Sequence, residues 1–582
     1  MKVSLKHIPE RTKLLLLSLM VGVLSGCAAV ILDWTIHAVR QLLDRGFPTG
    51  GYDWQYLILP GIGMLISLLL VRYLVRDNIG HGVTKVLLAV SRGDSKIKPH
   101  NMWSSMLTSS ITIGFGGSVG AEAPIVYTGA AIGSNIGRYF GLSYRNITLL
   151  LGCGAAGAVA GIFKAPLAGV LFTLEILLFN VSMTSLLPLL VSTISATVVS
   201  YIFRGQTPVF ACTLTPFSMG NIPFYIILGV FGGLGSLYFM RTTLRLEDRI
   251  GKIANVYVRW AVCAAALGLL IFLFPPLYGE GYDVIRQLIN GDCMTAIVNS
   301  PLSQFLSFNP QLVLVGYFVA IILLKIVASV ATNGAGGVGG IFAPSLFMGA
   351  IVGFVTARLM SMLGLSVSEA NFALVGMAGL MSGVMHAPLT GIFLIAELTG
   401  GYHLFMPLMI VSVISYLTIM LFEPHSLYAM RLAQKGELLT HNKDRNVLTL
   451  LKMDSVLETD FITIFPEMTL GQLVKVISTS NRNVFPVVDN DGHLRGILLL
   501  DEVRNIMFQP RLYKRFTVEQ LMTSPAAVLR SDMPMEKVME TFEDTGAWNL
   551  PVVDEERKYL GFVSKSKIFN SYRHVLVHFS EE

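Results

Sequence analysis

The sequence predicts an all-α, multispanning membrane domain built of two inverted repeats, followed by a smaller α/β module. Three observations lead to this fold class. Of the 582 residues, 53% are hydrophobic and 14% are charged, whereas a soluble protein carries about 25% charged residues. A glycine-rich motif occurs twice in the apolar part, at residues 114–124 and again at 334–344. Near Met430 the composition changes, and Asp, Glu, Lys and Arg become frequent.

The apolar part contains several uncharged runs that are long enough to cross a bilayer, which takes about 20 residues. They cover residues 14–32, 54–71, 181–203, 222–240, 261–277 and 402–422. The first run includes Leu-Ser-Gly-Cys ending at Cys27, a sequence that also occurs at lipoprotein cleavage sites. Because the run continues to Leu32, we expect a transmembrane helix with small residues for close packing. Basic residues precede it, which favours a cytoplasmic N-terminus.

The two halves of the membrane domain, residues 14–215 and 222–430, also share a second block of matching residues. Its glycines, an Ala-Pro-Leu tripeptide and a glutamate recur in the same order, so that Glu175 corresponds to Glu397. The match favours a shared structural role for these glutamates, such as capping or pairing. Residues 278–309 are polar and are expected to form an extramembrane loop. Paired Gly and Pro interruptions in two halves indicate a transport site between membrane repeats.

The two glycine-rich motifs suit a small anion. N–H groups at a helix N-terminus are unpaired and lie at the positive end of the helix dipole. Glycine lets the backbone approach the ion, and a proline in the first helical turn, such as Pro124 or Pro344, loses no hydrogen bond. Partial charges also release an ion readily, as conduction requires. The motifs therefore predict an anion site formed by uncharged main-chain amides.

The tail is itself duplicated. Pro-Val-Val-Asp begins at Pro486 and again at Pro551, and each copy is followed by a glycine and preceded by a helical pattern, which predicts strand, turn and strand. This order resembles the cystathionine-β-synthase (CBS) tandem domain and implies a cytoplasmic regulatory module that often binds adenine nucleotides. The predicted segments are a membrane domain at 1–430, a linker at 431–446 and CBS copies at 447–512 and 516–577.

Two interpretations of the tail stay open. The family's nucleotide motif, Gly-x-x-(Ser/Thr)-x-x-Asp, is incomplete in both copies, because Glu502 and Lys567 stand at the position of the aspartate and Leu499 at that of the first hydroxyl. Ser564 keeps the second hydroxyl, so an adenine-nucleotide site that includes it and a purely structural or dimer-packing role are both possible. The five scattered cysteines have no metal-ligand spacing, and we expect no metal and no other cofactor.

The membrane domain and the tail together resemble the CLC family of chloride channels and proton-coupled chloride exchangers, over nearly the whole chain. Four segments build that family's anion site. Their counterparts are Gly80-His81-Gly82-Val83-Thr84, Gly120-Ala121-Glu122-Ala123-Pro124, Gly340-Ile341-Phe342-Ala343-Pro344 and Tyr428. The resemblance implies anion contacts from Gly80, His81, Gly82, Gly120, Ala121, Ala123, Gly340, Ile341, Phe342 and Tyr428. His81 replaces a serine of the family; it can contact the anion, or it can point away while the N–H groups of Gly80 and Gly82 bind.

The resemblance also implies a gating role for Glu122, whose ionised carboxylate competes with the anion for the site. The alternative is a glutamate that complements a helix dipole. Exchangers of the family often carry a second glutamate after the position of Glu175 as a proton relay; here that position holds Ile176. An apolar residue is typical of the channel branch, although some exchangers also lack the glutamate. We therefore expect a voltage-gated chloride channel gated by Glu122, with a proton-coupled chloride antiporter as the alternative.

Other classes are less well supported. A CBS-regulated divalent-cation transporter would want several intramembrane carboxylates, and a zinc protease needs a His-Glu pair, which the sequence lacks. We expect a transport protein rather than an enzyme, without nucleic-acid partners because the net charge of +6 is small and spread out. The expected location is the cell (inner) membrane, as a multi-pass protein with a cytoplasmic tail. The resemblance implies a homodimer.

Overall fold

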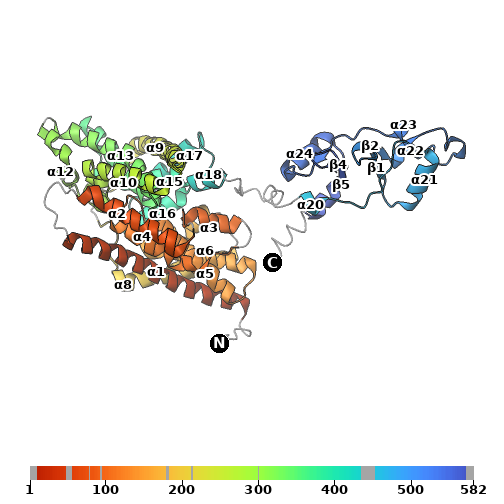
Figure 1. The fold of residues 1–582 in the computed structure, drawn as a ribbon. Coiled ribbons are helices and arrows are strands. Elements are labelled where there is room, and N and C mark those ends of the chain that lie inside the picture. The colour runs from red at the N-terminus through yellow and green to blue at the C-terminus, as the bar shows by residue number, and fades with distance from the viewer. Residues whose placement is uncertain are drawn as a thin grey trace. The chain divides into compact units, whose positions relative to one another are not determined.

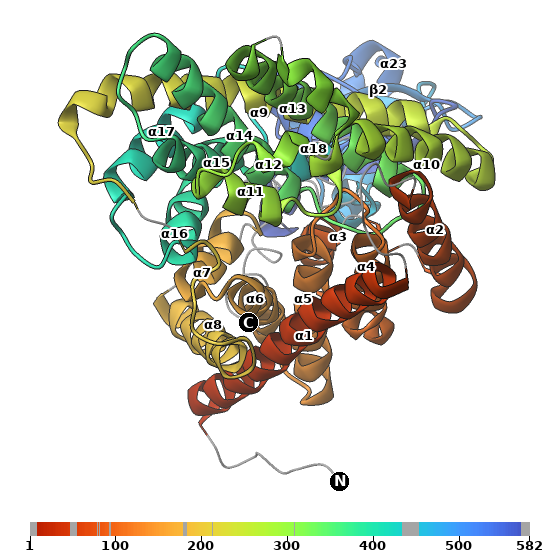
Figure 2. The ribbon, with the colours of Figure 1, turned by 90° about the vertical axis from the view of Figure 1, so that its left-hand side faces the viewer.

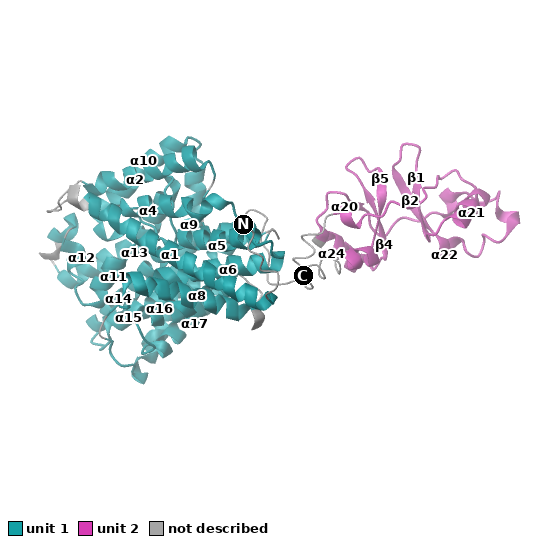
Figure 3. Cartoon of the chain, turned by 90° about the horizontal axis from the view of Figure 1, so that it is seen from below, with its two compact units in different colours: residues 1–438 teal, residues 439–582 magenta. Residues whose placement is uncertain are grey.

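The computed structural model describes residues 9–46, 55–77, 79–80, 82–91, 95–177, 183–211, 214–298, 300–307, 309–433 and 453–571. The chain divides into two compact units, residues 1–438 and 439–582 (Figure 3). The first is helical and the second combines short helices with small sheets (Figure 1). The predicted fold class is therefore confirmed.

The first unit contains two series of helices. Those of the first half are α1 (Glu10–Gly46), α2 (Gln55–Leu69) with its π-helical end η1 (Leu70–Val75), α3 (Gly82–Ser91), η2 (Pro99–Met102), α4 (Ser104–Gly114), α5 (Glu122–Tyr139), α6 (Tyr144–Phe163), α7 (Pro166–Glu175) and α8 (Met183–Arg204). Those of the second half are η3 (Met219–Asn221), α9 (Ile222–Gly251), α10 (Val256–Leu273), η4 (Pro275–Leu277), α11 (Tyr282–Ile289), α12 (Thr295–Val298), η5 (Pro301–Ser307), α13 (Pro310–Gly334), α14 (Phe342–Met362), α15 (Glu369–Met385), α16 (Pro388–Leu398) and α17 (Phe405–Met420), and α18 (Leu427–Ala433) follows.

Eight helices in the described part of the chain are long and apolar enough to cross a membrane. The first, α1, is continuous through Cys27. Its Gly26 packs directly on α8, where a side chain at Gly26 would meet the backbone of Ala196. The small residues before Cys27 thus lie within a helix–helix contact, as expected for close membrane packing.

The same packing pattern occurs in both halves. Helix α6 packs on α1, α5, α7 and α8, and α15 packs correspondingly on α9, α14, α16 and α17. The α5–α6 contact is very close at Gly129, where a Cβ would meet the carbonyl group of Gly154, and Gly349 faces Gly376 in the same way. The recurring glycines are therefore needed for close helix contact.

The two halves run in opposite directions where they meet at α7 and α16, which lie side by side (Figure 2). Glu175, at the end of α7, accepts hydrogen bonds from the N–H groups of Leu389 and Thr390 at the start of α16 (3.1 and 2.7 Å). Glu397, at the end of α16, accepts the N–H groups of Leu167 and Ala168 at the start of α7 (3.1 and 2.9 Å). The end of α7 therefore lies beside the start of α16, and the end of α16 lies beside the start of α7. This antiparallel arrangement is that of inverted repeats.

The second unit contains two similar modules. In the first, β1 (Val484–Val488) pairs antiparallel with β2 (Leu494–Leu499). In the second, β4 (Asn549–Val553) pairs antiparallel with β5 (Tyr559–Ser564) and parallel with β3 (Leu529–Arg530). The helical elements are α20 (Met453–Val456), α21 (Leu470–Thr479), α22 (Leu500–Val503), η6 (Pro510–Leu512), α23 (Val518–Leu521) and α24 (Met535–Thr545).

The aspartate of each Pro-Val-Val-Asp motif stabilises the turn that follows its strand. Asp489 accepts the N–H groups of Asp491 and His493 (3.1 and 2.8 Å). Asp554 accepts those of Glu556 and Lys558 (2.9 and 2.8 Å). The predicted strand, turn and strand are therefore present in both copies.

Candidate functional site

The two glycine-rich loops meet at the centre of the membrane unit. Gly120 N–H donates to the Gly340 carbonyl at 2.9 Å, and Gly340 N–H donates to the Gly120 carbonyl at 2.7 Å. The pair forms an isolated antiparallel β-bridge. Gly120 and Gly340 each lie two residues before the start of a helix, α5 and α14 respectively, so the first turns of two helices from opposite halves face a common point.

Two threonines brace the bridge in matching ways. The Oγ1 atom of Thr332, on α13, accepts the N–H of Ser118 in the first loop at 3.1 Å. The Oγ1 atom of Thr112, on α4, accepts the N–H of Val338 in the second loop at 3.0 Å. Gly116 and Gly336 turn the two loops with φ angles of 96° and 95°, values that favour glycine.

These bonds decide which of the predicted amides are free in this conformation. The N–H groups of Gly120 and Gly340 bond to each other, and the N–H of Ala121 donates to the Glu280 carboxylate at 2.9 Å. Ala123 and Phe342 lie in the first turns of α5 and α14, where an N–H has no partner within the helix. The N–H groups that the helices leave unpaired therefore lie three residues after Gly120 and two residues after Gly340.

Glu122 is the first residue of α5 and is 3% exposed. Its Oε1 accepts a hydrogen bond from the Tyr282 hydroxyl at 2.6 Å. Its Oε2 is buried without a hydrogen-bond partner and lies against Gly120, on the side where Ala343 of α14 also approaches. The carboxylate thus occupies the junction of the two helix starts, and one of its oxygens still lacks a partner there.

Two further predicted segments lie next to this junction. Gly82, at the start of α3, packs so closely on α5 that a side chain there would meet the carbonyl of Ala123. Tyr428, on α18, is 1% exposed and lies near Glu122, and its hydroxyl has no hydrogen-bond partner. A buried hydroxyl of this kind is normally paired. It is thus available to a ligand at the site.

The remaining predicted residues are distributed as follows. Gly80 precedes α3 with a φ of 47°, and His81 lies outside the described residues. Ile341 caps α14 and is buried, as is Phe342, whose ring lies near the rings of two aromatic residues of the first half. Ile176, at the proton-relay position, follows α7 and is 4% exposed. An isoleucine side chain has no group that could accept a proton, so Ile176 cannot act as a relay.

Three residues of this region, Glu280, Tyr282 and Lys325, were not predicted from the sequence. Residues 278–309 were expected to form an extramembrane loop, but they contain short helices, Gly279 and Gly281 are buried, and Gly279 N–H bonds to the Gly116 carbonyl at 3.2 Å. Glu280 and Tyr282 therefore reach the site, and Lys325 lies fully buried on α13. A charged residue within an apolar span, such as Lys325, was the signal that could have revealed them.

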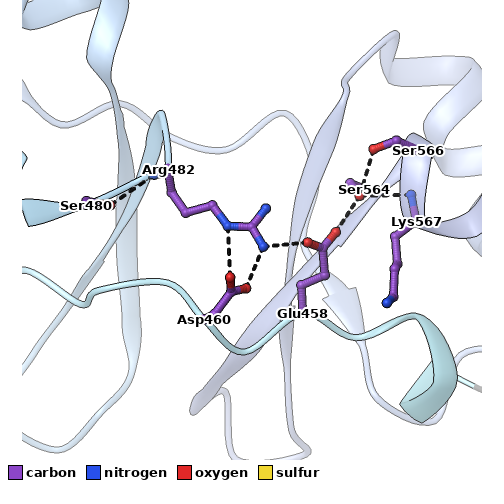
Figure 4. A network of polar contacts seen from close by, with 7 residues as sticks. All are labelled: Glu458, Asp460, Ser480, Arg482, Ser564, Ser566 and Lys567. Carbon is purple, nitrogen blue, oxygen red and sulfur yellow. Dashed lines mark hydrogen bonds and ion pairs between the residues drawn. The ribbon is translucent and has the colours of Figure 1, made fainter.

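In the second unit, Ser564 belongs to a polar network (Figure 4). Its hydroxyl donates to Glu458 Oε1 at 2.5 Å and accepts the N–H of Lys567 at 3.1 Å. Arg482 donates to Glu458 at 2.7 Å and to Asp460 at 2.5 Å. The hydroxyl considered for a nucleotide thus already has partners within the protein, one of them an anion.

Inverted halves, helix starts that converge on a buried carboxylate, and membrane-spanning helices define an integral membrane transport protein. Residues 62–419 match the model of the voltage gated chloride channel family, and residues 453–508 and 518–574 match the CBS domain. The chain belongs to this chloride channel family, which transports anions and includes both channels and exchangers, and carries tandem CBS domains.

Several named proteins and solved structures are similar to this chain. The chain is 28% identical to chloride channel protein CLC-e of Arabidopsis thaliana, over 67% of this chain and 57% of that protein. It is 27% identical to the H(+)/Cl(-) exchange transporter ClcA of Vibrio cholerae, over 68% of this chain and 84% of that protein. Its fold matches a slow cyanobacterial Cl-/H+ antiporter with a TM-score of 0.62 and 22% identity, over 74% of this chain and 98% of the other. A eukaryotic CLC transporter matches at 0.60 and 19%, over 96% and 98%.

Proposed function

We propose that the protein is a proton-coupled chloride antiporter in which Glu122 is both the gate and the proton carrier. The observation that carries this proposal is the position of the Glu122 carboxylate, which lies at the junction of α5 and α14 with one oxygen unpaired. Ionised, it occupies the place of an anion; protonated, it loses its charge and can leave. Relatives named as H(+)/Cl(-) exchange transporters support this reading over the simple channel that the sequence favoured.

The anion site in this proposal combines donors from four segments. The N–H groups of Ala123, Ile341 and Phe342 and the hydroxyl of Tyr428 contact the ion directly. Gly82, the first residue of α3, closes the site from the side of Ala123. Gly120, Ala121 and Gly340 hold the two helix starts in place in the conformation described above.

A chloride channel is the second candidate, and one observation favours it. Ile176 stands where many exchangers of the family carry a proton-accepting glutamate, and it is buried. A channel with this residue would move chloride without protons. Exchange therefore requires a proton route that does not use position 176.

The test is reconstitution of the purified protein in liposomes that carry an outward chloride gradient. An antiporter drives protons inward, and the internal pH falls while chloride leaves; a channel gives chloride flux alone. Glu122→Gln should keep chloride flux, lose proton movement and lose most of the pH dependence of chloride flux. Wild-type pH dependence in this variant would refute the role of Glu122.

The remaining features follow from the family. We propose a homodimer in the cell membrane with a cytoplasmic N-terminus and a cytoplasmic tail. The proposed division is a membrane domain at 1–430, a linker, and CBS copies at 447–512 and 516–577. Cross-linking in native membranes and protease protection of the tail test the assembly and the orientation.

A further inference from the structure

A buried lysine, Lys325, lies close to Glu280 and has no role in the function proposed above. Lys325 is 0% exposed, and its ammonium donates to the Ser118 hydroxyl at 2.9 Å and to the Gly279 carbonyl at 3.1 Å. It also lies 4.7 Å from the centre of the Phe347 ring. An isolated charge at this depth is costly, so negative groups nearby must compensate for it.

Glu280 is one of these groups. It follows Gly279 directly, interacts electrostatically with Lys325, and accepts the N–H of Ala121, the residue that precedes Glu122. Tyr282, two residues further on, donates to Glu122. Two hydrogen bonds thus tie the segment of Glu280 to that of Glu122, and Glu280 interacts electrostatically with Glu122.

The two carboxylates differ in their access to solvent. Glu122 is 3% exposed, whereas Glu280 is partly exposed. A cavity of about 450 Å³ lies nearby, lined by Asp33, Trp34 and His37 of α1, Lys164, Arg204 and Arg286, among others. Asp33 interacts electrostatically with Glu280, and Arg286 follows Tyr282 by one turn of α11. Glu280 therefore interacts both with Asp33, which lines the cavity, and with the buried gate Glu122.

The charges of this group limit its protonation states. Facing the two carboxylates are Lys325 from α13, Tyr428 from α18, Tyr282 and Arg286 from α11, and Asp33 from α1, which is paired with Arg204 at 3.0 Å. With Lys325 charged and both carboxylates ionised, the buried centre carries one net negative charge. One shared proton makes it neutral, since two close carboxylates titrate as a pair. Each anion that enters then favours the uptake of one more proton.

We propose that Glu280 exchanges protons between the cavity and Glu122, and so supplies the proton route that the apolar Ile176 does not. A hydronium ion in the cavity gives its proton to the Glu280 carboxylate. Glu280 then passes it to the Glu122 carboxylate, directly or through one water, and returns to the ionised form beside Lys325. The reverse sequence releases the proton. This inference rests on the proposed antiport.

The test uses Glu280→Gln in the full-length protein. Glutamine keeps an oxygen that can accept the Ala121 N–H, so a merely structural role survives, but it cannot carry a proton. Chloride flux and proton flux are measured together in the same liposomes. The expected result is chloride flux within a factor of about two of wild type and proton flux reduced about a hundredfold or more, which is the scale of a lost proton-transfer group.

Asp292→Asn is the matched control, because Asp292 is an exposed carboxylate just after α11; both of its fluxes should equal those of wild type. Proton flux of Glu280→Gln that tracks chloride flux in the wild-type ratio would overturn the inference. An equal loss of both fluxes in correctly folded, monodisperse protein would also overturn it and assign Glu280 a structural role. If the wild-type protein moves no protons, the proposed antiport fails, and this inference with it; if only Glu280→Gln behaves as wild type, the antiport stands.

Discussion

Glu175 holds the start of α16 with three hydrogen bonds, whereas its repeat partner Glu397 holds the start of α7 with two. The additional donor is the hydroxyl of Thr390, which reaches Glu175 at 2.7 Å. Both carboxylates thus cap a helix of the opposite half, and the cap of the second half is the better satisfied. The difference of one hydrogen bond between the two caps leads to a first prediction.

Substitution of either capping glutamate by glutamine should destabilise the membrane unit. Loss of a charged cap costs about 0.5–2 kcal/mol, and the third bond should place Glu175→Gln about 1 kcal/mol above Glu397→Gln. Thermal unfolding of the detergent-solubilised protein measures the difference. Glu369→Gln, a carboxylate paired only with Arg358, is the comparison. Equal losses for the two caps would contradict the assigned role of Thr390.

The threonine braces of the glycine loops should be essential for packing. Thr332→Val keeps the shape but leaves the buried N–H of Ser118 unpaired, at a cost of about 1–3 kcal/mol. Thr112→Val should cost more, because Thr112 also bonds to the Ser67 hydroxyl at 2.9 Å. Thr356→Val is the control, since its hydroxyl bonds to the carbonyl of its own helix. Unfolding midpoints and chloride flux are both measured, and a control as damaging as the braces would refute the prediction.

The first CBS hairpin should weaken in acid. The backbone N–H of His493 is the largest cause that holds the pKa of Asp489 below its usual value, and the charges of His493 and Arg495 and the N–H of Asp491 act in the same direction. Because the folded pKa is the lower one, the stabilisation is complete above the unfolded value of about 3.9 and is lost as the pH falls through the folded value.

Hydrogen exchange of the full-length protein, corrected for the intrinsic rates, should show this loss in β1 and β2 below about pH 4. Asp489→Asn should show reduced protection already at pH 6, with little further change in acid. Asp491→Asn alters an exposed carboxylate of the same turn and should behave as wild type. An unchanged acid profile in Asp489→Asn would contradict the assignment.

The network around Ser564 should weaken adenine-nucleotide binding. Glu458 accepts the Ser564 hydroxyl and would repel a phosphate there. Glu458→Gln removes the charge and releases Arg482 from one of its two carboxylates, so ATP affinity of the full-length protein should rise by about tenfold, as for one removed like charge nearby. Asp460→Asn also frees Arg482 but lies further along the network and should change affinity less. A stronger effect of Asp460→Asn would show that Arg482, and not the charge beside Ser564, controls binding.

Much of this architecture could be predicted because it is repeated. Glycines that allow two helices to touch, and glutamates that cap a helix of the other half, recur at matching positions, and the recurrence separates them from background. Glu280 and Lys325 have no such counterpart: one lies in a polar stretch that reads as a loop, and the other is a single charge in an apolar helix. Glu280 and Lys325 come together only because residues 278–282 fold back on α5. The hydrophobic periodicity of the sequence carries no information about this fold-back. The mutual bonding of Gly120 and Gly340 likewise requires the three-dimensional approach of both loops.

The bridge between Gly120 and Gly340 also bears on how access to the site alternates. Many transporters with inverted repeats work by rocking one half against the other around a central binding site. Here such a motion would have to break two reciprocal main-chain bonds and two threonine braces at its pivot. The halves are therefore expected to stay locked together through the whole transport cycle, and opening and closing fall to the swing of single side chains.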